Sequence, residues 1–175
     1  NRIRMIFYNQ IRVKQSEFEK DGDDLKLSTK GRYGLRALID LALYSESEAV
    51  SIQSIATRQN ISDSYLEQLV RKLKSAGLVV SVRGAQGGYK LARPAGEISV
   101  GDVLRALEGS LDAVTCNGGG EHSCQGADLC VTRYVWQRIN NSIKETVDSI
   151  MLDQLVEESR RMRDKGQIQV QKCDN

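Results

Sequence analysis

The 175-residue sequence has only one proline, one histidine and one tryptophan, and aromatic residues make up 5% of it. No apolar run reaches the ~20 residues that a membrane-spanning helix needs, and no signal-peptide pattern opens the sequence. We therefore expect a cytoplasmic protein with no membrane partner. A single histidine, with no C-x-x-C pair, Ser/His/Asp set or phosphate-binding loop, leaves little chemistry for catalysis. We predict that the protein is not an enzyme.

Charge is unevenly distributed, although the net charge is only +2. Residues 26–93 contain 11 Lys and Arg against 5 Asp and Glu, whereas residues 94–175 contain 9 against 13. A basic half of this kind is typical of a surface that meets a polyanion, although a solvated face can have the same composition. The basic half is therefore where we look for a DNA-binding unit.

Three helices are predicted in this basic half. Apolar residues recur at helical spacing over residues 30–45 and 62–77, and a short helix over residues 51–59 lies between them. Asn60 can end the short helix in a left-handed conformation. Two helices joined by a tight polar turn are typical of a helix-turn-helix.

A glycine-rich hairpin follows the third helix. The stretch "LVVSVRGAQGGYKLA" predicts two strands around a tight turn, and a further helix over residues 98–109 begins with a Ser99–Asp102 capping pattern. The fold class we predict is mainly α with a small β-hairpin. A winged helix-turn-helix domain would span residues 25–109, followed by a long dimerisation helix.

That long helix begins at Val131. Apolar residues recur every three or four positions over about five turns: Tyr134, Val135, Trp136, Ile139, Ile143, Val147 and Ile150. Since no other helix of similar length is predicted, a second copy of the chain is the expected partner, which gives a homodimer. We assign residues 133–163 to the dimerisation helices, with residues 152–159 folding back on the long helix. The chain is expected to be disordered from Arg160, with residues 164–175 as a flexible tail.

The N-terminal residues of the third helix would enter the major groove of an operator in double-stranded DNA. The candidates for base contact are Ser64, Tyr65, Glu67 and Gln68. Gln68 can pair with adenine and Glu67 can accept from cytosine. Ser62 or Ser64 caps the helix, and Glu67 also fits a capping box with Ser64 or an ion pair with Arg71.

Basic residues around this helix are candidates for contact with the DNA backbone. In the hairpin, Arg83 and Gly84 suit a tip that enters the minor groove. The candidate phosphate contacts are Arg71, Lys72 and Lys74 on the outer face of the third helix, with Lys30, Arg32 and Arg36 on the first.

The stretch "CNGGGEHSCQGADLC" contains three of the four cysteines, Cys116, Cys124 and Cys130. In a reducing compartment, clustered thiols bind metal more often than they pair as disulfides. Structural zinc sites usually have cysteines two to four residues apart, which this stretch lacks. The spacing favours an iron–sulfur cluster and leaves zinc, or redox-active thiols without metal, as alternatives.

Four stretches resemble the IscR group of winged-helix regulators, whose wider family includes the NsrR, RirA and CymR types. They are "LSTKGRYGLRALIDLA", "ISDSYLEQLVRKLKSAGLVVSVRGAQGGYKLARP", "EISVGDVLRALEGS" and "CQGADLCVTRYVW". The resemblance covers residues 26 to about 157 and is most specific in the wing and in the cysteine-rich loop, residues 110–132. The thiols argue against the CymR type, which lacks this cysteine set.

The resemblance implies a homodimeric regulator, a repressor in our prediction, whose operator binding depends on an iron–sulfur cluster. Its targets would be genes for iron–sulfur cluster assembly or related iron and redox functions. By motif position Cys116, Cys124 and Cys130 would be the cluster ligands. We favour a [2Fe-2S] cluster, and a [4Fe-4S] cluster, as in the NsrR and RirA types, is also compatible.

One position departs from the IscR pattern. Many IscR-type proteins have a histidine three residues after the last cysteine as the fourth ligand, and here that position is Arg133, which cannot ligate. The candidates for the fourth ligand are His122, Glu121, a residue of the partner chain or a small exogenous molecule.

Residues 1–24 lie outside the resemblance. Family members typically begin "M-[KR]-L-[ST]", and here Leu25 precedes "KLST". We expect residues 1–24 to be a disordered arm or an upstream extension absent from the native protein, with Leu25 as the true start.

Overall fold

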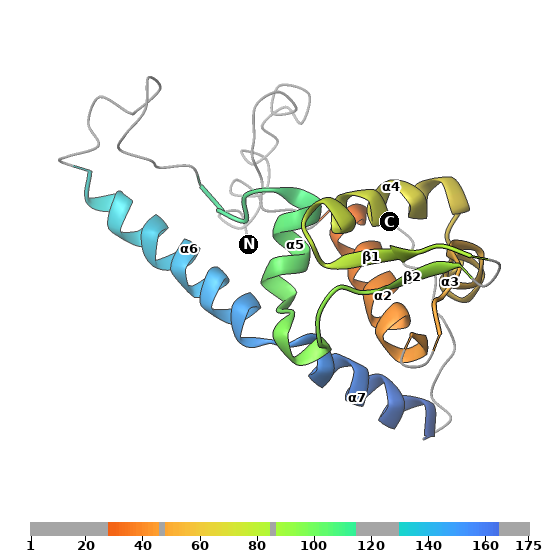
Figure 1. Ribbon diagram of the computed structural model, residues 1–175. Coiled ribbons are helices and arrows are strands. Elements are labelled where there is room, and N and C mark those ends of the chain that lie inside the picture. The colour runs from red at the N-terminus through yellow and green to blue at the C-terminus, as the bar shows by residue number, and fades with distance from the viewer. Residues whose placement is uncertain (1–27, 46–47, 85–86, 115–129, 165–175) are drawn as a thin grey trace, which may run out of the picture.

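The computed structural model describes residues 28–45, 48–84, 87–114 and 130–164, and Figure 1 shows the arrangement of its elements. In chain order these are α2 (Thr29–Tyr44), α3 (Ile52–Gln59), α4 (Asp63–Ser75), β1 (Val79–Val82), β2 (Gly88–Leu91), the 3-10 helix η1 (Ala95–Glu97), α5 (Val100–Glu108), α6 (Val131–Ser149) and α7 (Leu152–Asp164). The predicted fold, mainly α with a small β-hairpin, is confirmed. The predicted arm at residues 1–24 lies outside the described residues.

Local capping groups define the helix-turn-helix. The Ser51 hydroxyl accepts a hydrogen bond from the backbone N–H of Ser54 and begins α3, and Asn60 ends it in the left-handed region with φ 53° and ψ 50°. Ser62 then caps α4 by accepting from the N–H of Tyr65. Of the two serines predicted for this role, Ser62 is the cap, and the alternative based on Ser64 is wrong.

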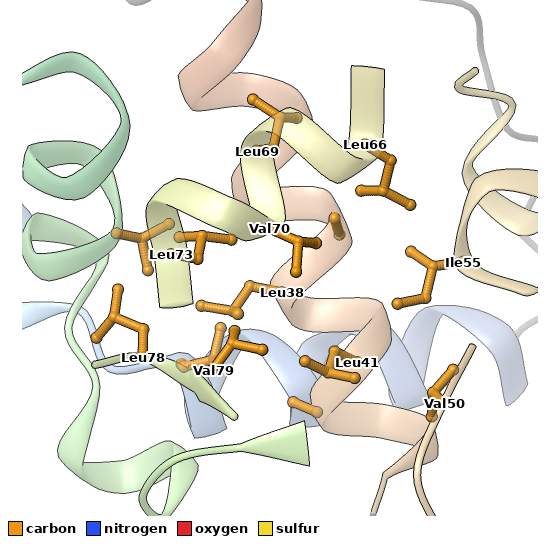
Figure 2. Packing of buried hydrophobic residues seen from close by; sticks show 14 of the residues in the cluster. Leu38, Leu41, Val50, Ile55, Leu66, Leu69, Val70, Leu73, Leu78 and Val79 are labelled. Carbon is orange, nitrogen blue, oxygen red and sulfur yellow. The ribbon is translucent and has the colours of Figure 1, made fainter. Parts of the chain in front are cut away.

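The hydrophobic core lies between α2, α3, α4 and the hairpin (Figure 2). Leu38 and Leu41 of α2 face Ile55 of α3 and the inner stripe of α4. That stripe consists of Leu66, Leu69, Val70 and Leu73, each at most 4% exposed. Burying each such side chain contributes about 1.5–3 kcal/mol. The apolar spacing of α4 therefore leaves only its opposite face for a ligand.

The wing is an antiparallel hairpin in which Val79 lies opposite Leu91 and Val82 opposite Gly88. Val50, just before α3, forms a bridge to Tyr89 on the other edge of β2. The wing is thereby joined by backbone hydrogen bonds to the segment that leads into the helix-turn-helix.

Helices α2 and α5 approach closely. A Cβ atom at Gly34 would collide with the Leu107 side chain, so this crossing needs a glycine. At the end of α5, the Glu108 carboxylate accepts from the backbone N–H groups of Ser28 and Gly31 at 3.1 and 2.8 Å. An acidic group at a helix N-terminus stabilises it, and here it fixes α2 to α5.

Helix α6 projects from this core with its N-terminal end outermost and runs back towards α5, and α7 then packs on the core (Figure 1). Leu152 and Val156 of α7 are buried in the core cluster, and α7 packs against α2 and η1. The N–H of Leu152 donates to the carbonyl of Ile98 at 2.8 Å. The prediction that residues 152–159 fold back on α6 is therefore wrong, because Leu152 and Val156 are buried in the core of the winged helix instead. The helix also continues beyond Arg160, where we expected disorder.

Candidate nucleic-acid interface and the cysteine-rich loop

The outer face of α4 carries the predicted base-contacting side chains. Ser64, Glu67 and Gln68 are exposed, as a group that reads DNA must be. Tyr65 is half-buried, and its ring meets that of Tyr33 edge-on with centroids 6.1 Å apart. Burial, followed by the neighbouring carboxylate of Glu108, raises the pKa of Tyr65, which therefore stays a neutral phenol. The edge-on contact between the rings of Tyr65 and Tyr33 therefore helps to hold α4 against α2.

Three basic residues of α4, predicted as phosphate contacts, differ in their surroundings. Arg71 is exposed. The Lys72 ammonium donates to the carbonyl of Leu107 at 2.9 Å, near the C-terminus of α5. The Lys74 ammonium donates to the Ser81 hydroxyl in β1, also at 2.9 Å. The two lysines therefore connect α4 to α5 and to the wing, a role that sequence spacing did not indicate.

At the wing, Arg83 and Gly84 follow β1 and are both exposed. Gly84 has φ 127°, which side-chain-bearing residues rarely adopt, so this bend needs glycine. Two residues of the turn, 85–86, lie outside the described residues. An exposed arginine beside a glycine bend has the shape expected of a tip that enters a DNA groove.

The first helix presents Lys30 and Arg32 on its exposed face, near its N-terminus. Arg36, one turn further, is engaged within the protein. Its guanidinium donates to the side chain and to the carbonyl of Gln59 at 3.2 and 3.1 Å, and lies over the ring of Tyr33. Arg36 therefore joins α2 to the end of α3.

A buried ion pair holds the end of α3, and sequence analysis missed it. The Asp40 side chain is fully buried and accepts from Arg58 at 2.6 Å and from Gln59 at 2.8 Å. A buried carboxylate must be paired or its desolvation destabilises the fold, so Asp40 fixes the residues just before the turn at Asn60. The one available signal was an acidic residue inside the apolar stripe of residues 30–45.

In the cysteine-rich loop, Cys130 is described, whereas Cys116, His122 and Cys124 lie outside the described residues. Cys130 is the N-cap of α6, and its Sγ lies 3.0 Å from the hydroxyl of Thr132. This hydrogen bond, followed by that of the Arg133 N–H, lowers the pKa of the Cys130 thiol. Thiolates are the form that binds soft metals, so Cys130 fits the predicted role. The described residues contain no group of three side chains able to hold a metal ion.

Asn140 and Cys130 connect α6 to the two ends of this loop. The Asn140 side chain accepts from the N–H of Ala113 at 2.8 Å and donates to the carbonyl of Val114 at 3.1 Å. The chain therefore lies against α6 at Ala113 and Val114, in the first part of the loop, and joins α6 again at Cys130. Among the described helices, none is long and apolar enough to cross a membrane.

Comparison with known proteins shows which protein family this chain belongs to. The model of the Rrf2 family, described as iron-dependent transcriptional regulator, matches residues 27–158. The HTH-type transcriptional regulator IscR of Pectobacterium atrosepticum is 46% identical over 132 residues, which cover 75% of this chain and 79% of the relative. IscR of Vibrio campbellii is 43% identical over 135 residues, covering 77% and 79%.

Solved structures give the same result. The structure of T. potens IscR superimposes with a TM-score of 0.62 at 44% identity, over 82% of this chain and 92% of that one. CymR, the global cysteine regulator of B. subtilis, gives 0.61 at 41% identity, over 76% and 97%. These relatives are transcriptional regulators, which are not enzymes. The resemblance drawn from the sequence is thereby confirmed: the chain belongs to the Rrf2 family and is a DNA-binding transcription regulator of the IscR type.

Proposed function

We propose that this regulator is a homodimer whose operator binding is controlled by an iron–sulfur cluster held by Cys116, Cys124 and Cys130. The observation that supports the proposal best is the position of Cys130, whose thiolate is favoured at the start of the helix that leads back to the DNA-binding domain. The IscR name of the relatives also points to a cluster. We further propose that the protein acts in the cytoplasm as a repressor of iron–sulfur assembly or related genes, and has no enzymatic activity.

The exposed apolar side chains of α6 support the homodimer. Tyr134 is 62% exposed, Val135 47% and Ile139 36%, and α6 has no buried residue. A helix with an apolar stripe normally buries it, and an uncovered patch marks a protein interface. In the dimer a second copy of the chain covers this stripe.

The two-fold symmetry of the proposed dimer also determines how it would bind DNA. Two α4 helices would enter major grooves about one helical turn apart on a roughly palindromic site. Ser64, Glu67 and Gln68 face the bases, with Tyr65 at their edge. Lys30, Arg32 and Arg71 contact phosphates, Arg83 and Gly84 meet the minor groove, and Lys72 and Lys74 lie close enough to add positive charge.

Ion pairs give α6 a defined attachment to the DNA-binding domain. Asp148 near its end accepts from Arg105 of α5 at 2.7 Å, and Arg105 also pairs with Asp102, which accepts from Arg93 beyond the wing. When bound, a cluster supplies a redox- and iron-sensitive group at the other end of α6. Any change in how the two α6 helices pair then reaches α5 and the wing through this chain of ion pairs.

The fourth coordination position distinguishes this chain from the usual IscR pattern. Arg133 follows Cys130 within the first turn of α6, and its guanidinium, which only donates hydrogen bonds, cannot take the place of a histidine ligand. We propose that His122, Glu121, a residue of the partner chain or a small molecule fills the position. Three protein thiolates suit a [2Fe-2S] cluster and are also compatible with a [4Fe-4S] cluster.

The test is iron and acid-labile sulfide per chain, with a visible absorption spectrum, on protein purified without oxygen. We expect near-equal iron and sulfide, lost in a variant with Cys116, Cys124 and Cys130 all changed to Ala. The operator affinities of the two proteins should differ, whereas Cys173→Ala, which changes the fourth cysteine of the sequence, outside the cysteine-rich loop, should match the unmodified chain. Equal affinities at every site would contradict control by the cluster.

A second candidate is a zinc- or thiol-based redox regulator on the same fold. The lowered pKa of the Cys130 thiol favours it as well, because thiolates are the form that reacts with oxidants. Protein that contains zinc, or no metal after attempted reconstitution, would select this alternative.

A further inference from the structure

Tyr44, at the C-terminus of α2, contacts arginines from two other helices. The Arg58 guanidinium of α3 lies 4.1 Å from the centre of its ring. The Arg163 guanidinium of α7 lies 5.1 Å from the same centre and donates to the Tyr44 hydroxyl at 2.7 Å. Tyr44 thus joins α7 to α3, which is the first of the two helices of the helix-turn-helix.

Two positive charges beside one ring would repel each other unless one were compensated. Arg58 is compensated by the buried Asp40 carboxylate, which it contacts through two nitrogens at 2.6 to 3.1 Å. Hydrogen bonding to Asp40 outweighs burial and raises the pKa of Arg58, so Arg58 stays charged. Arg163 can therefore approach the aromatic ring as a second cation.

The place of these contacts matters for DNA binding. Arg58 lies two residues before Asn60, whose left-handed conformation sets the angle between α3 and α4. Arg163 lies near the end of α7, which follows directly on α6. The contacts through Tyr44 therefore run from the α6–α7 unit to the turn that orients the recognition helix.

We propose that Arg163 is a positioning residue for DNA binding: it holds α7 to the helix-turn-helix through Tyr44 and thereby fixes the orientation of α4. Arg163 does not touch DNA in this role. The proposal rests on operator binding but not on a bound cluster, so it stands whichever metal state the protein has.

Arg161 provides a matched control on the same helix. It pairs locally with Glu158 at 2.8 Å, and its side chain is 64% exposed. Arg161→Ala and Arg163→Ala remove the same charge, but only the second breaks the contact with Tyr44.

The experiment measures the affinity of the full-length chain for a duplex that the unmodified protein selects from a random pool, across a range of salt concentrations. We expect Arg163→Ala to weaken binding about threefold to tenfold, and Arg161→Ala less than about twofold. The slope of affinity against salt should be unchanged in both, whereas loss of a phosphate contact would lower the slope by about one.

Tyr44→Phe removes the hydroxyl and keeps the ring, and should give an intermediate loss. Tyr44→Leu should weaken binding at least as much as Arg163→Ala, because it also removes the contact of the ring with Arg58. The double variant should be no weaker than Tyr44→Leu alone, because Arg163 then has no ring or hydroxyl to contact. In hydrogen exchange of the free protein, Arg163→Ala should speed exchange of α3 amides, which a role confined to α7 would leave unchanged.

A lower salt slope for Arg163→Ala, additive losses in the double variant, or equal effects of the two arginines would each overturn the proposal. Failure of the unmodified chain to select any duplex would instead contradict its function as a DNA-binding regulator. Thermal unfolding followed by circular dichroism confirms that each variant is folded before its affinity is compared.

Discussion

The apolar side chains of the winged-helix core and those of the long helix α6 differ in their exposure to solvent. In the core, Leu38 and Leu66 are at most 1% exposed, whereas Tyr134 of α6 is 62% exposed. Both regions show the same helical spacing of apolar residues. The same spacing therefore has two outcomes among the described residues: the core stripes are buried within one chain, whereas the stripe of α6 is exposed and is the surface of the proposed dimer.

The first prediction, with the largest expected effect, concerns a cavity made in the winged-helix core. Leu38→Ala removes a side chain packed from all sides, and we expect the free energy of unfolding to fall by about 3 kcal/mol. Urea denaturation followed by circular dichroism measures this loss. A loss below about 1 kcal/mol would show that the core relaxes around the cavity.

The second prediction concerns a residue of α6 in the proposed dimer interface. Ile139→Lys should leave the fold of one chain intact but weaken self-association by at least about tenfold, because it places a charge in the apolar stripe. Sedimentation velocity over a range of concentrations measures the association. Asn141→Lys, at an exposed position of the same helix, is the charge-matched control, and an equal effect of both would contradict the proposed interface.

The third tests how α6 is attached to the core. A Cβ atom at Gly101 would collide with the Asp148 carboxylate and lie 2.9 Å from the Arg105 guanidinium. Gly101→Ala should therefore displace these two side-chain ends and separate the ion pair. Because the pair is partly exposed and alanine favours the helix, the net change in the free energy of unfolding should stay within about 1 kcal/mol. Chemical denaturation measures this change, and a loss of several kcal/mol would show that α6 cannot shift to make room.

The fourth prediction concerns the pH dependence of stability that Asp102 causes. Burial disfavours the ionised form of Asp102, but hydrogen bonds from Ser99 and Arg105 and the charge of Arg93 outweigh burial and lower its pKa. Because the folded pKa is below that of the unfolded chain, the carboxylate stabilises the fold above about pH 4. This contribution is lost as the pH falls through the folded pKa. Asp102→Asn should therefore cost more stability at pH 7 than at pH 3 in urea titrations; an equal cost at both would contradict the assignment.

The smallest expected effect on stability lies at the start of α6. Thr132→Val removes the hydroxyl that bonds to the Cys130 sulfur, so the pKa of this thiol should rise towards its ordinary value. Alkylation of metal-free protein, followed by mass spectrometry of the peptide that contains Cys130, should show the pH profile displaced upwards. Thr132→Ser keeps the hydroxyl and should retain the profile of the unmodified chain.

Features that depend on neighbours in the sequence were predictable. Ser51 and Asn60 bound α3 because a cap satisfies backbone groups only a few residues away. The inner stripe of α4 and the glycine hairpin were predictable for the same reason. The exposure of Ser64, Glu67 and Gln68 follows from that stripe, and their contacts with DNA stay predictions.

Features that depend on distant partners were not predictable. Lys72 and Lys74 look like phosphate contacts on the helix surface, yet their ammonium groups reach α5 and β1. We predicted that α7 packs on α6, whereas it packs on α2 and η1. An apolar stripe indicates that a helix face is buried, but it does not indicate which surface buries it.

By itself, the sequence determined the boundaries of the helices in the DNA-binding domain, the winged helix and the family, since caps, spacing and motifs act over short distances along the chain. Only the tertiary structure decided that Asp40 neutralises Arg58, that Tyr44 joins α3 to α7, and that the described part of the chain buries no residue of α6. These outcomes depend on which side chains meet across the fold. Long flexible side chains and apolar stripes have several possible partners, and packing selects one of them.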